Sequence, residues 1–448
     1  MSTPRAAFCA IDFGTSNSAI AIPAPDDAGQ TGMRLVPLEG AHLTMPTAVF
    51  YATDADDLPP AARPGPSLDD ALPRCFGRAA VQAYVDGYEG RLMRSMKSVL
   101  GTALVDQTTE VGQGLGVKYL DIVTSYLRHL RHQAEAAGGQ PLSQVVLGRP
   151  VYFVDDDVVR DAAAQASLEA AARAVGFTDI AFQFEPIAAA LDFEQHCTQE
   201  EHVLVADIGG GTSDFSVVRV GPDRIKRLDR REDILASHGV HIAGTDFDRH
   251  IELTGILREF GYRAHGPSRP GQPPREVPSG IYFDLATWHL INTCYSPQRV
   301  MELRNMKSFY GDARHHQRLM TVLEERLGHE LAHRAEDAKI AVAGGGGCSI
   351  DLGLIESGLN VDLSEDAAVG ALSGDIERIA EAGRDTVARA GLKPADVDAL
   401  YFTGGSTGLR LLAERIAADY PAARQVRGDR FASVATGLGL HAARLFAA

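Results

Sequence analysis

Short apolar runs in this chain alternate with turns rich in glycine and hydroxyl residues. The run 8–13 breaks at Gly14 and resumes over 18–22, which predicts a short β-hairpin. The same pattern returns in the runs 202–207 and 215–220, which flank a second glycine-rich turn 195 residues (207 − 12) further on. A repeat this long predicts two related α/β halves rather than a solenoid, whose period is roughly 20–50 residues. We therefore expect a ligand site between the halves.

Other segments complete the two expected halves. An apolar strand at 145–148 leads to three acids at 155–157. These acids favour the start of the Ala-rich helix 158–175, because negative charge complements the helix dipole there. The last third of the chain returns to a strand at 399–403, followed by a glycine turn and a closing segment at 434–448.

A four-residue stripe marks a further helix. The stripe consists of Leu319, Leu323, Leu327, Leu331 and Ala335. It predicts one continuous amphipathic helix that ends at the glycines 344–347. Just before it, His315 and His316 have no spaced partners, and we interpret them as a polar turn.

Length and composition limit the class of protein. The 448 residues allow two to four domains of ~100–200 residues each, and a hydrophobic content of 45% gives each a core. A formal charge of −16 argues against a general nucleic-acid or anionic-membrane binder. No apolar stretch reaches the ~18 residues of a membrane span, and no charged-then-apolar leader begins the chain. We expect a cytoplasmic protein whose five scattered cysteines are reduced thiols.

The two glycine-rich turns suggest phosphate binding. A triphosphate needs closely approaching backbone N–H donors, and its chelated metal needs fixed carboxylates. Asp12 and Asp207 each end a strand and are expected to hold Mg²⁺ through water. The phosphates would lie against Gly14, Thr15, Ser16, Asn17, Gly209, Gly210, Gly211 and Thr212. One such loop alone is most simply a tight turn, but two copies at this spacing favour a phosphate site.

These loops resemble those of a known family. Residues 10–18 and 206–214 resemble the two phosphate loops of the actin-like ATPases, and within them of the heat shock protein 70 chaperones. Residues 404–407 are similar to the family's adenosine loop, 185–191 to the start of its connecting helix, and 244–248 to the segment after its second hairpin. The resemblance implies an α/β, two-lobed actin-like ATPase fold. Duplicated ribonuclease-H-like mixed sheets would be flanked by helices, each lobe would carry an inserted subdomain, and ATP or ADP with Mg²⁺ would be the cofactors.

The resemblance also assigns roles. Lys97 matches the lysine that positions the attacking water and the γ-phosphate, and Glu185 the carboxylate near that water. Asp214 would be a further acid beside it, and Thr212 a hydroxyl near the γ-phosphate. The remaining nucleotide contacts would be Gly244, Thr245, Glu336, Lys339, Ile340, Gly404, Gly405 and Ser406, with Glu336 and Lys339 facing the ribose. Phosphoryl transfer would then rest on positioning and charge neutralisation.

Some positions depart from the family pattern. Ile340 stands where typical members place an arginine stacked on adenine, Gly408 where they have another arginine, and Phe431 where they have an aspartate. Typical members also continue into a peptide-binding domain, whereas only 438–448 follows Gly437 here. The chain therefore resembles the short, YegD-type members. We expect a nucleotide-driven switch whose partners, such as co-chaperones, bind its lobes.

The resemblance predicts a division into two lobes. Lobe I would span 1–201, with its core at 1–44 and 117–201 and an inserted subdomain at 45–116. Lobe II would span 202–448, with its core at 202–245 and 331–430, an inserted subdomain at 246–330, and a terminal helix 431–448 packed back on lobe I.

A rival motif lies in the leucine-striped helix. His329, Glu330 and His333 fit the H-E-x-x-H signature of zinc proteases, with Glu356 as a formal third ligand. Each histidine is two residues from a stripe leucine, so both are expected to point to solvent. A protease is therefore disfavoured.

Three functions remain. The first is a chaperone-family ATPase module. The second is a nucleotide-binding regulator or scaffold that does not hydrolyse ATP, which the departures from the family pattern motivate. The third is an actin-fold small-molecule kinase, which we rank lowest because such kinases use an Asp base toward a substrate hydroxyl.

Overall fold

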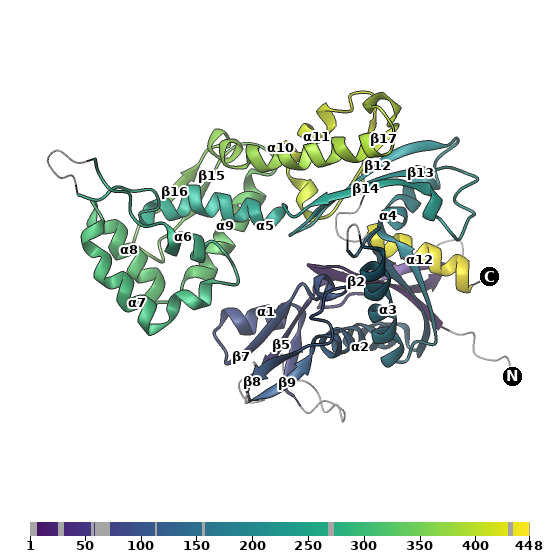
Figure 1. The fold of residues 1–448 in the computed structure, drawn as a ribbon, viewed down its shortest axis with the longest axis horizontal. Coiled ribbons are helices and arrows are strands. Elements are labelled where there is room, and N and C mark those ends of the chain that lie inside the picture. The colour runs from purple at the N-terminus through teal and green to yellow at the C-terminus, as the bar shows by residue number, and fades with distance from the viewer. Residues whose placement is uncertain are drawn as a thin grey trace.

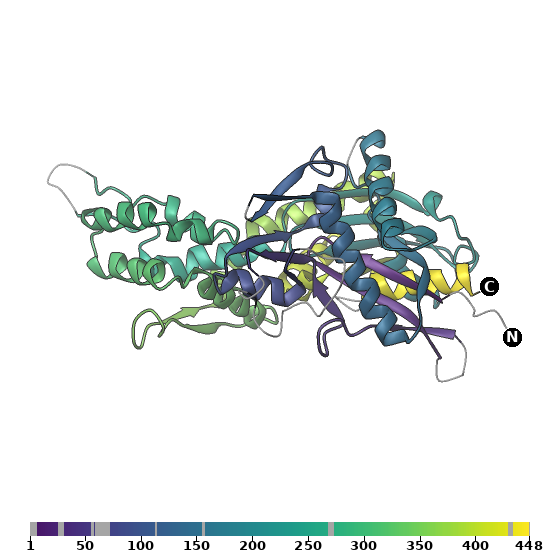
Figure 2. The same cartoon turned by 90° about the horizontal axis from the view of Figure 1, so that it is seen from below.

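The computed structural model describes residues 7–25, 31–54, 58, 72–112, 114–154, 157–267, 273–428 and 433–447. Two mixed sheets lie one above the other on the right of Figure 1, and a helical extension reaches to the left. Figure 2 shows that this extension continues away from both sheets along the long axis of the molecule.

The first sheet belongs to the N-terminal half. Its path runs β11-β10-β1-β2-β3, and β4 pairs with β2. β1 is parallel to β10 and antiparallel to β2, and β10 is parallel to β11. The strands are β1 (Ala7–Phe13), β2 (Asn17–Pro25), β3 (Thr31–Leu35), β4 (Thr44–Pro46), β10 (Leu142–Arg149) and β11 (Asp179–Phe184).

The second sheet repeats the first. Its order is β18-β17-β12-β13-β14, with β12 parallel to β17 and antiparallel to β13. Each strand therefore has a counterpart with the same place and direction in the first sheet. The strands are β12 (Glu201–Ile208), β13 (Ser213–Val220), β14 (Ile234–Val240), β17 (Ala399–Thr403) and β18 (Arg424–Arg427). This duplication confirms the predicted two-lobed α/β fold.

The helices repeat in the same order. Counted along the five-stranded path that the two sheets share, one helix precedes the fourth strand of each half, one joins the fourth and fifth strands, and one follows the fifth strand. In the first half these are α2 (Tyr119–Gly138), α3 (Val158–Ala174) and α4 (Glu185–Glu194). In the second half they are α10 (Glu365–Arg389), α11 (Arg410–Ala418) and α12 (Ser433–Phe446). The N-cap of α3 is Asp157, whose side chain accepts from the amide of Arg160, as the acids before this helix suggested.

Each half carries an insert. The N-terminal insert contains β5 (Ala48–Ala52), β6 (Arg74–Phe76), α1 (Gly77–Val85), β7 (Gly90–Arg94), the 3-10 helix η3 (Met96–Val99), β8 (Thr108–Gly112) and β9 (Leu115–Lys118). The larger C-terminal extension contains α5 (Gly244–Ile251), η5 (Glu252–Ile256), η6 (Leu257–Phe260), α6 (Gly280–Leu285), η7 (Ile291–Tyr295), α7 (Pro297–Arg304), η8 (Asn305–Phe309), α8 (Ala313–Glu324), α9 (Gly328–Val342), β15 (Cys348–Asp351) and β16 (Asn360–Leu363).

One apolar cluster joins the two sheets. Phe8 and Val146 of the first sheet share it with Val203 of the second, and α4 and α12 supply the side chains between them. The two helices cross closely, because a methyl group on Gly437 would lie 1.9 Å from the carbonyl oxygen of Ala188. Only glycine fits this crossing, so α12 is fixed against α4 and the first sheet.

The leucine stripe does not form one helix, so that prediction is wrong. The structure breaks it into α8 and α9, and Arg326 between them has a φ of 57°, outside the helical region. Leu319 and Leu323 before the break and Leu331 after it are buried in the same core. The periodicity therefore continues across the break because both helices bury one face in one place.

The structure also decides three smaller predictions, on the two adjacent histidines, the cysteines and the membrane span. His315 and His316 lie in α8 rather than in a turn, and His316 is buried with its Nε2 3.0 Å from the carbonyl oxygen of Leu303. The five cysteines are free thiols. Among the described residues, no helix is both long and apolar enough to cross a bilayer.

Candidate functional site

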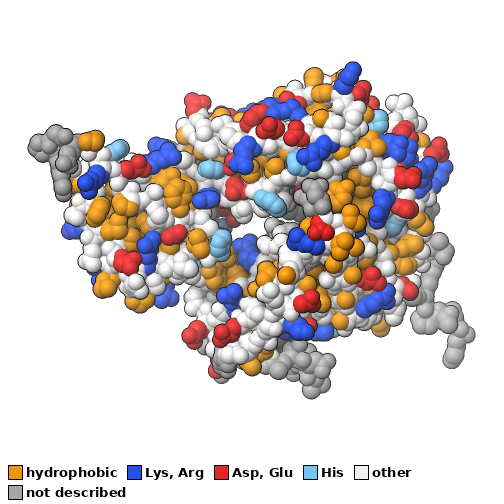
Figure 3. Space-filling view, in the orientation of Figure 1, with side chains coloured by type: hydrophobic (Ala, Val, Ile, Leu, Met, Phe, Trp, Pro, Cys, Tyr) orange, Lys and Arg blue, Asp and Glu red, His pale blue; other side chains and the backbone are white. Residues whose placement is uncertain are grey.

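The two glycine-rich turns meet between the halves. Asp12 lies next to the end of β1 and Asp207 next to the end of β12, so the repeat places both carboxylates at equivalent strand ends. A methyl group on Gly210 would lie 3.0 Å from the Oγ of Ser16, which shows how closely the two turns approach. Figure 3 shows an opening between the two halves of the molecule.

A charged cluster lies beside the turns. Lys97, in η3 of the N-terminal insert, is buried, and its Nζ lies 2.5 Å from Oε1 of Glu185. Glu185 is the first residue of α4, where a negative charge is stabilised by the helix dipole. The charges of Asp12 and Asp207 also act on this lysine. The structure thus brings four of the predicted residues together from four separate elements.

Burial and neighbouring negative charges raise the pKa values of the two aspartates. Burial is the larger cause for both, and the charge of Glu185 adds to it. The pKa of Asp207 rises to about 7, with Asp214 as a further negative neighbour, and that of Asp12 also rises well above its ordinary value. Lys97 counteracts these shifts, and although its own burial disfavours the ammonium ion, the neighbouring carboxylates raise its pKa. The cluster therefore places three carboxyl groups, those of Asp12, Asp207 and Glu185, around one ammonium group.

A threonine that the sequence did not reveal holds the first turn. The amide of Thr47 donates to the carbonyl oxygen of Ser16 at 2.9 Å. The side-chain Oγ1 of Thr47 donates to the carbonyl oxygen of Gly14 at 2.8 Å. The hydroxyl of Ser18 lies 2.9 Å from the same Oγ1. Thr15 and Ser16 are half-buried, and Asn17 at the start of β2 is exposed. No motif marks Thr47, because its role depends on a strand pairing between β2 and β4.

The second turn is held through its carbonyl groups. The carbonyl oxygen of Gly209 accepts from Ser406 Oγ at 2.7 Å and from the amide of Gly244 at 3.2 Å. The carbonyl oxygen of Gly210 accepts two hydrogen bonds from Thr245, one from its amide at 2.8 Å and one from its hydroxyl at 2.7 Å. In the part of the chain that the structure describes, the amides of Gly210 and Gly211 have no acceptor. The turn is therefore fixed in place while its N–H donors stay available to an anion.

Thr212 and Asp214 lie at the end of the same turn. The hydroxyl of Thr212 donates to Oδ2 of Asp214 at 2.8 Å, and Asp214 is exposed. Gly404 precedes the 3-10 helix η10 (Gly405–Gly408), which contains Ser406. A methyl group on Gly404 would lie 2.4 Å from the carbonyl oxygen of Ile208, so this turn abuts the end of β12.

The predicted ribose-facing residues, Glu336 and Lys339, lie along α9. Nζ of Lys339 lies 2.7 Å from Oδ1 of Asp248 and donates to the carbonyl oxygen of Gly244 at 3.4 Å. Burial raises the pKa of Asp248 to about 6, against the lowering effect of Lys339. Asp248 was not among the predicted site residues, although it lies in the segment that resembles the family. This pair fixes α9 to the start of α5, directly beside the second turn.

Two predicted contacts on α9 are exposed to solvent. Glu336 is exposed, and Ile340 has 61% of its surface exposed. Neither makes a hydrogen bond to the glycine-rich turns within the described residues. Of the other departures from the family pattern, Gly408 ends η10, and Phe431 lies outside the described residues. The phosphate side of the site is therefore better defined in this structure than the adenosine side.

The donor set fits a hydrated magnesium ion better than a directly ligated metal. Within the described residues, no group of three or more His, Cys, Asp or Glu side chains is arranged to hold a metal. Asp12 and Asp207 supply two carboxyl groups at opposing strand ends, and burial, followed by neighbouring carboxylates, raises the pKa of each. Mg²⁺ usually keeps several waters and takes one or two carboxylates beside phosphate oxygens, which these residues can satisfy.

The zinc-protease motif does not form a site. His329 is buried rather than exposed, because the break before α9 turns the first residues of that helix toward the N-terminal insert. Its Nε2 lies 3.1 Å from Oδ1 of Asn292, whereas His333 is exposed and lies 3.8 Å from Asp337. Glu356 is paired with Arg318 at 2.5 Å. The expected solvent position of His329 was wrong, and the rejection of a metal role stands.

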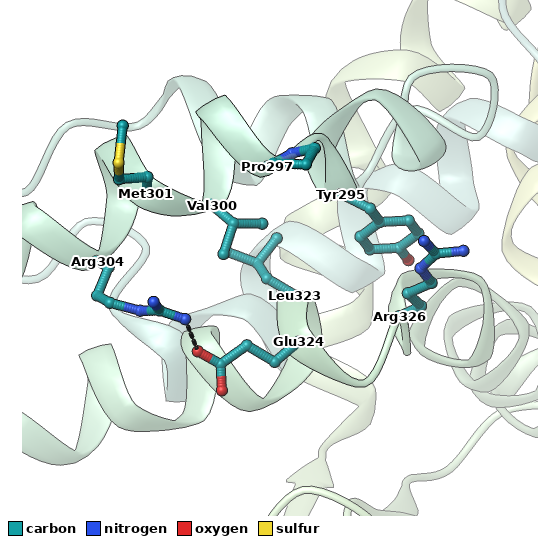
Figure 4. A pocket seen from close by; sticks show the side chains of 8 residues that line it. All are labelled: Tyr295, Pro297, Val300, Met301, Arg304, Leu323, Glu324 and Arg326. Carbon is teal, nitrogen blue, oxygen red and sulfur yellow. Dashed lines mark hydrogen bonds and ion pairs between the residues drawn. The ribbon is translucent and has the colours of Figure 1, made fainter.

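A separate cavity of about 420 Å³ lies on the C-terminal extension. Figure 4 shows Val300 and Leu323 in the middle of the lining, with Arg304 on one side and Arg326 on the other. Nη2 of Arg304 lies 2.7 Å from Oε1 of Glu324. None of the predicted nucleotide residues lines it. It is therefore distinct from the site between the halves.

Two α/β halves of the same topology, with a glycine-rich turn from each half at their junction, define the actin-like ATPase fold. A family model described as "Hsp70 protein" matches residues 9–263 of this chain. The match covers more than half of the chain, and the chain belongs to the Hsp70 family.

Curated relatives agree with this assignment. The chain is 30% identical over 271 residues to the chaperone protein DnaK of Thermosipho melanesiensis, which covers 59% of this chain and 38% of the relative. It is 30% identical over 261 residues to the chaperone protein DnaK of Thermosipho africanus and to that of Thermotoga maritima, with 57% of this chain and 36% of each relative covered. The match thus spans less than two fifths of the length of these relatives.

Proposed function

We propose that this chain binds ATP with Mg²⁺ between its two lobes, 1–201 and 202–448, and hydrolyses it. The nucleotide state would then change how the lobes close on each other. One observation carries the proposal: Lys97 and Glu185 converge with Asp12 and Asp207 beside two turns that approach each other across the lobes.

Each residue has a task that follows from its chemistry. The free amides of the second turn would bind phosphate oxygens, and Lys97 would neutralise charge on the γ-phosphate while it orients the attacking water. Glu185, held at 2.5 Å from Lys97, would accept a hydrogen bond from that water. Thr212, fixed by its bond to Asp214, would present a hydroxyl near the γ-phosphate.

The metal would complete the charge balance. Asp12 and Asp207 would hold Mg²⁺ through its water ligands, and the ion would supply charge neutralisation for the phosphate oxygens. The three carboxyl groups around one lysine support this assignment, because a bound cation would favour their ionised forms.

Single-turnover hydrolysis of radiolabelled ATP at saturating Mg²⁺ tests the proposal. The wild type should release phosphate, and Lys97→Ala should slow the chemical step by about 100-fold or more, as loss of a charge-stabilising group does. Lys118→Ala is the control, because Lys118 is an exposed lysine of the same insert.

Three other outcomes would decide against the catalytic assignment. Equal rates for wild type and Lys97→Ala would exclude Lys97 from the chemical step. Nucleotide binding without turnover in the wild type would favour a regulator or scaffold. A phosphorylated small molecule formed in place of free phosphate would favour a kinase.

A further inference from the structure

The cavity on the C-terminal extension has an apolar wall. Its volume is about 420 Å³, and α7 and α8 supply most of its lining. Val300 and Leu323 form the middle of this lining (Figure 4), and Pro297 and Met301 extend it along α7. Met301 has 59% of its surface exposed. A flexible methionine at the edge can adapt to apolar molecules of different shapes.

Two hydrogen-bond donors lie together at one end of the cavity. The guanidinium of Arg326 lies beside the hydroxyl of Tyr295 (Figure 4), and its charge acts on that hydroxyl. Burial raises the pKa of Tyr295 to about 12, so the phenol keeps its proton near neutral pH. The Tyr295 oxygen accepts from the amide of Gly328 at 2.8 Å, which fixes the ring. This end of the cavity therefore offers an O–H and a guanidinium side by side.

These donors are not used within the described part of the chain. There, the side chain of Arg326 forms no ion pair or hydrogen bond, and the proton of the Tyr295 hydroxyl has no acceptor. The other arginine of the lining, Arg304, is neutralised by Glu324. Arg326 also has a φ of 57°, and residues other than glycine that are held in this region are typical of functional sites such as ligand clamps. One positive charge of the lining is therefore available to an anion.

The size of the cavity indicates a small molecule rather than a protein partner. Its volume lies within the roughly 300–1,000 Å³ of small-molecule sites, whereas a stable protein interface takes about 20–30 residues from each partner. A carboxylate accepts strong, charge-assisted hydrogen bonds from a guanidinium group.

We propose that this cavity binds a small organic carboxylate. The apolar body of the ligand lies against Val300 and Leu323. Its carboxylate accepts hydrogen bonds from the guanidinium of Arg326 and the hydroxyl of Tyr295. The inference goes beyond the proposed nucleotide binding and does not depend on it, because none of the predicted nucleotide residues lines the cavity.

The test uses a biphenyl carboxylate that carries a para-trifluoromethyl group, added to the full chain without nucleotide. Binding is followed by fluorine NMR, from the broadening of the probe resonance as protein is added. The wild type should bind the probe with a dissociation constant of about 0.01–1 mM, the range expected for an aromatic ligand of this size. The corresponding carboxamide should bind about tenfold more weakly, because it lacks the charge that strengthens the hydrogen bonds.

Two variants locate the two ends of the probe. Arg326→Gln should weaken binding of the carboxylate about tenfold and leave that of the carboxamide nearly unchanged. Met301→Glu should weaken both probes, because it places a charge against their apolar body. Arg263→Gln is the matched control for Arg326→Gln, since Arg263 is an exposed arginine of the same extension with a φ of 56° that does not line the cavity.

Arg263→Gln should bind the carboxylate as the wild type does. A wild type that leaves the probe resonance unbroadened would overturn the site. Equal dissociation constants for the carboxylate in the wild type and Arg326→Gln, or for the carboxylate and the carboxamide in the wild type, would overturn the recognition of a carboxylate by Arg326.

Discussion

Nζ of Lys97 lies 2.5 Å from Oε1 of Glu185, and the two residues are 88 positions apart in the sequence. The lysine comes from the N-terminal insert and the glutamate from the first turn of the helix that follows the first sheet. The pair is therefore formed only when the insert is folded against its sheet. The charges of Asp12 and Asp207 also act on Lys97, so one ammonium group faces three carboxyl groups.

The first prediction concerns the carboxyl group of Asp12. Asp12→Asn keeps the shape of the side chain and removes a carboxyl group whose ionised form the folded state disfavours, so it should raise the free energy of unfolding of the ligand-free protein by about 0.5–2 kcal/mol. The same change should abolish the stabilisation by Mg-ATP, which for the wild type is about 2.7 kcal/mol at 100 times the dissociation constant. Urea denaturation with and without Mg-ATP measures both effects.

Asp106→Asn is the control for Asp12→Asn, because Asp106 is exposed in the same half. It should leave the free energy of unfolding and the effect of Mg-ATP unchanged. A ligand-free Asp12→Asn protein that is less stable than the wild type, or one that Mg-ATP still stabilises fully, would contradict the prediction.

The second prediction concerns Gly404. Its φ of 85° and ψ of 148° lie in a region that is essentially restricted to glycine, and an added methyl would lie 2.4 Å from the carbonyl oxygen of Ile208. Gly404→Ala should therefore lower the free energy of unfolding by about 2–4 kcal/mol, from backbone strain and overpacking together.

Gly391→Ala separates the two contributions. Gly391 also has a positive φ, of 73°, but an added methyl there would meet nothing within 4 Å. This variant should lose only the roughly 1–2 kcal/mol of the left-handed conformation. Guanidinium denaturation of both variants measures the difference, and equal losses would show that the contact with Ile208 contributes nothing.

The repeated hairpin made the fold readable from the sequence. Each copy places an Asp near the end of a strand and a glycine-rich turn after it, and the structure keeps that register in β1 and β12. Local pattern was sufficient here because a hairpin is formed by residues close in sequence. The pairing of Lys97 with Glu185 could not be derived in this way, and it was expected only from the family resemblance.

The errors share a physical cause. The stripe through Leu323 and Leu331 records only which face is buried, so it could not reveal the left-handed residue Arg326 between two helices. His329 was expected in solvent because its helix was considered alone, whereas Tyr84 from the other half covers it. Burial that depends on a contact between distant segments leaves no local pattern.

The third prediction concerns a buried ion pair behind α4. Nη1 and Nη2 of Arg230 each donate to Glu194 at 2.8 Å, and both side chains are almost completely buried. Arg230→Met should lower the free energy of unfolding by about 3–5 kcal/mol, because it leaves a buried carboxylate without its partner. The double variant with Glu194→Leu should recover part of this loss, since no unpaired charge then remains on α4.

Arg415→Ala is the matched control. Arg415 pairs with Glu377 at 2.6 Å near the surface, and such pairs contribute about 0–1 kcal/mol. Urea denaturation of the wild type and the three variants would give the comparison. A loss for Arg230→Met no larger than that for Arg415→Ala would contradict the importance of the buried pair.

The fourth prediction concerns pH and His441 in α12. Nε2 of Gln183 donates to Nδ1 of His441 at 3.1 Å, which requires a free lone pair on that nitrogen. Burial, followed by the charges of Arg444 and Arg230, lowers the pKa of His441 to about 4. Because the folded pKa lies below the ordinary value of about 6.5, this histidine stabilises the fold fully above pH 6.5, and the contribution is lost as the pH falls toward 4.

The loss should approach about 1.4 kcal/mol per pH unit in that window, and it should total about 1.6 kcal/mol between pH 6.5 and pH 5. His441→Asn keeps an acceptor for Gln183 without a group that titrates, so its free energy of unfolding should fall less steeply between pH 6.5 and 5 than that of the wild type. His42→Asn, at an exposed histidine, should follow the wild-type curve. Parallel pH curves for His441→Asn and the wild type would show that His441 does not link protonation to folding.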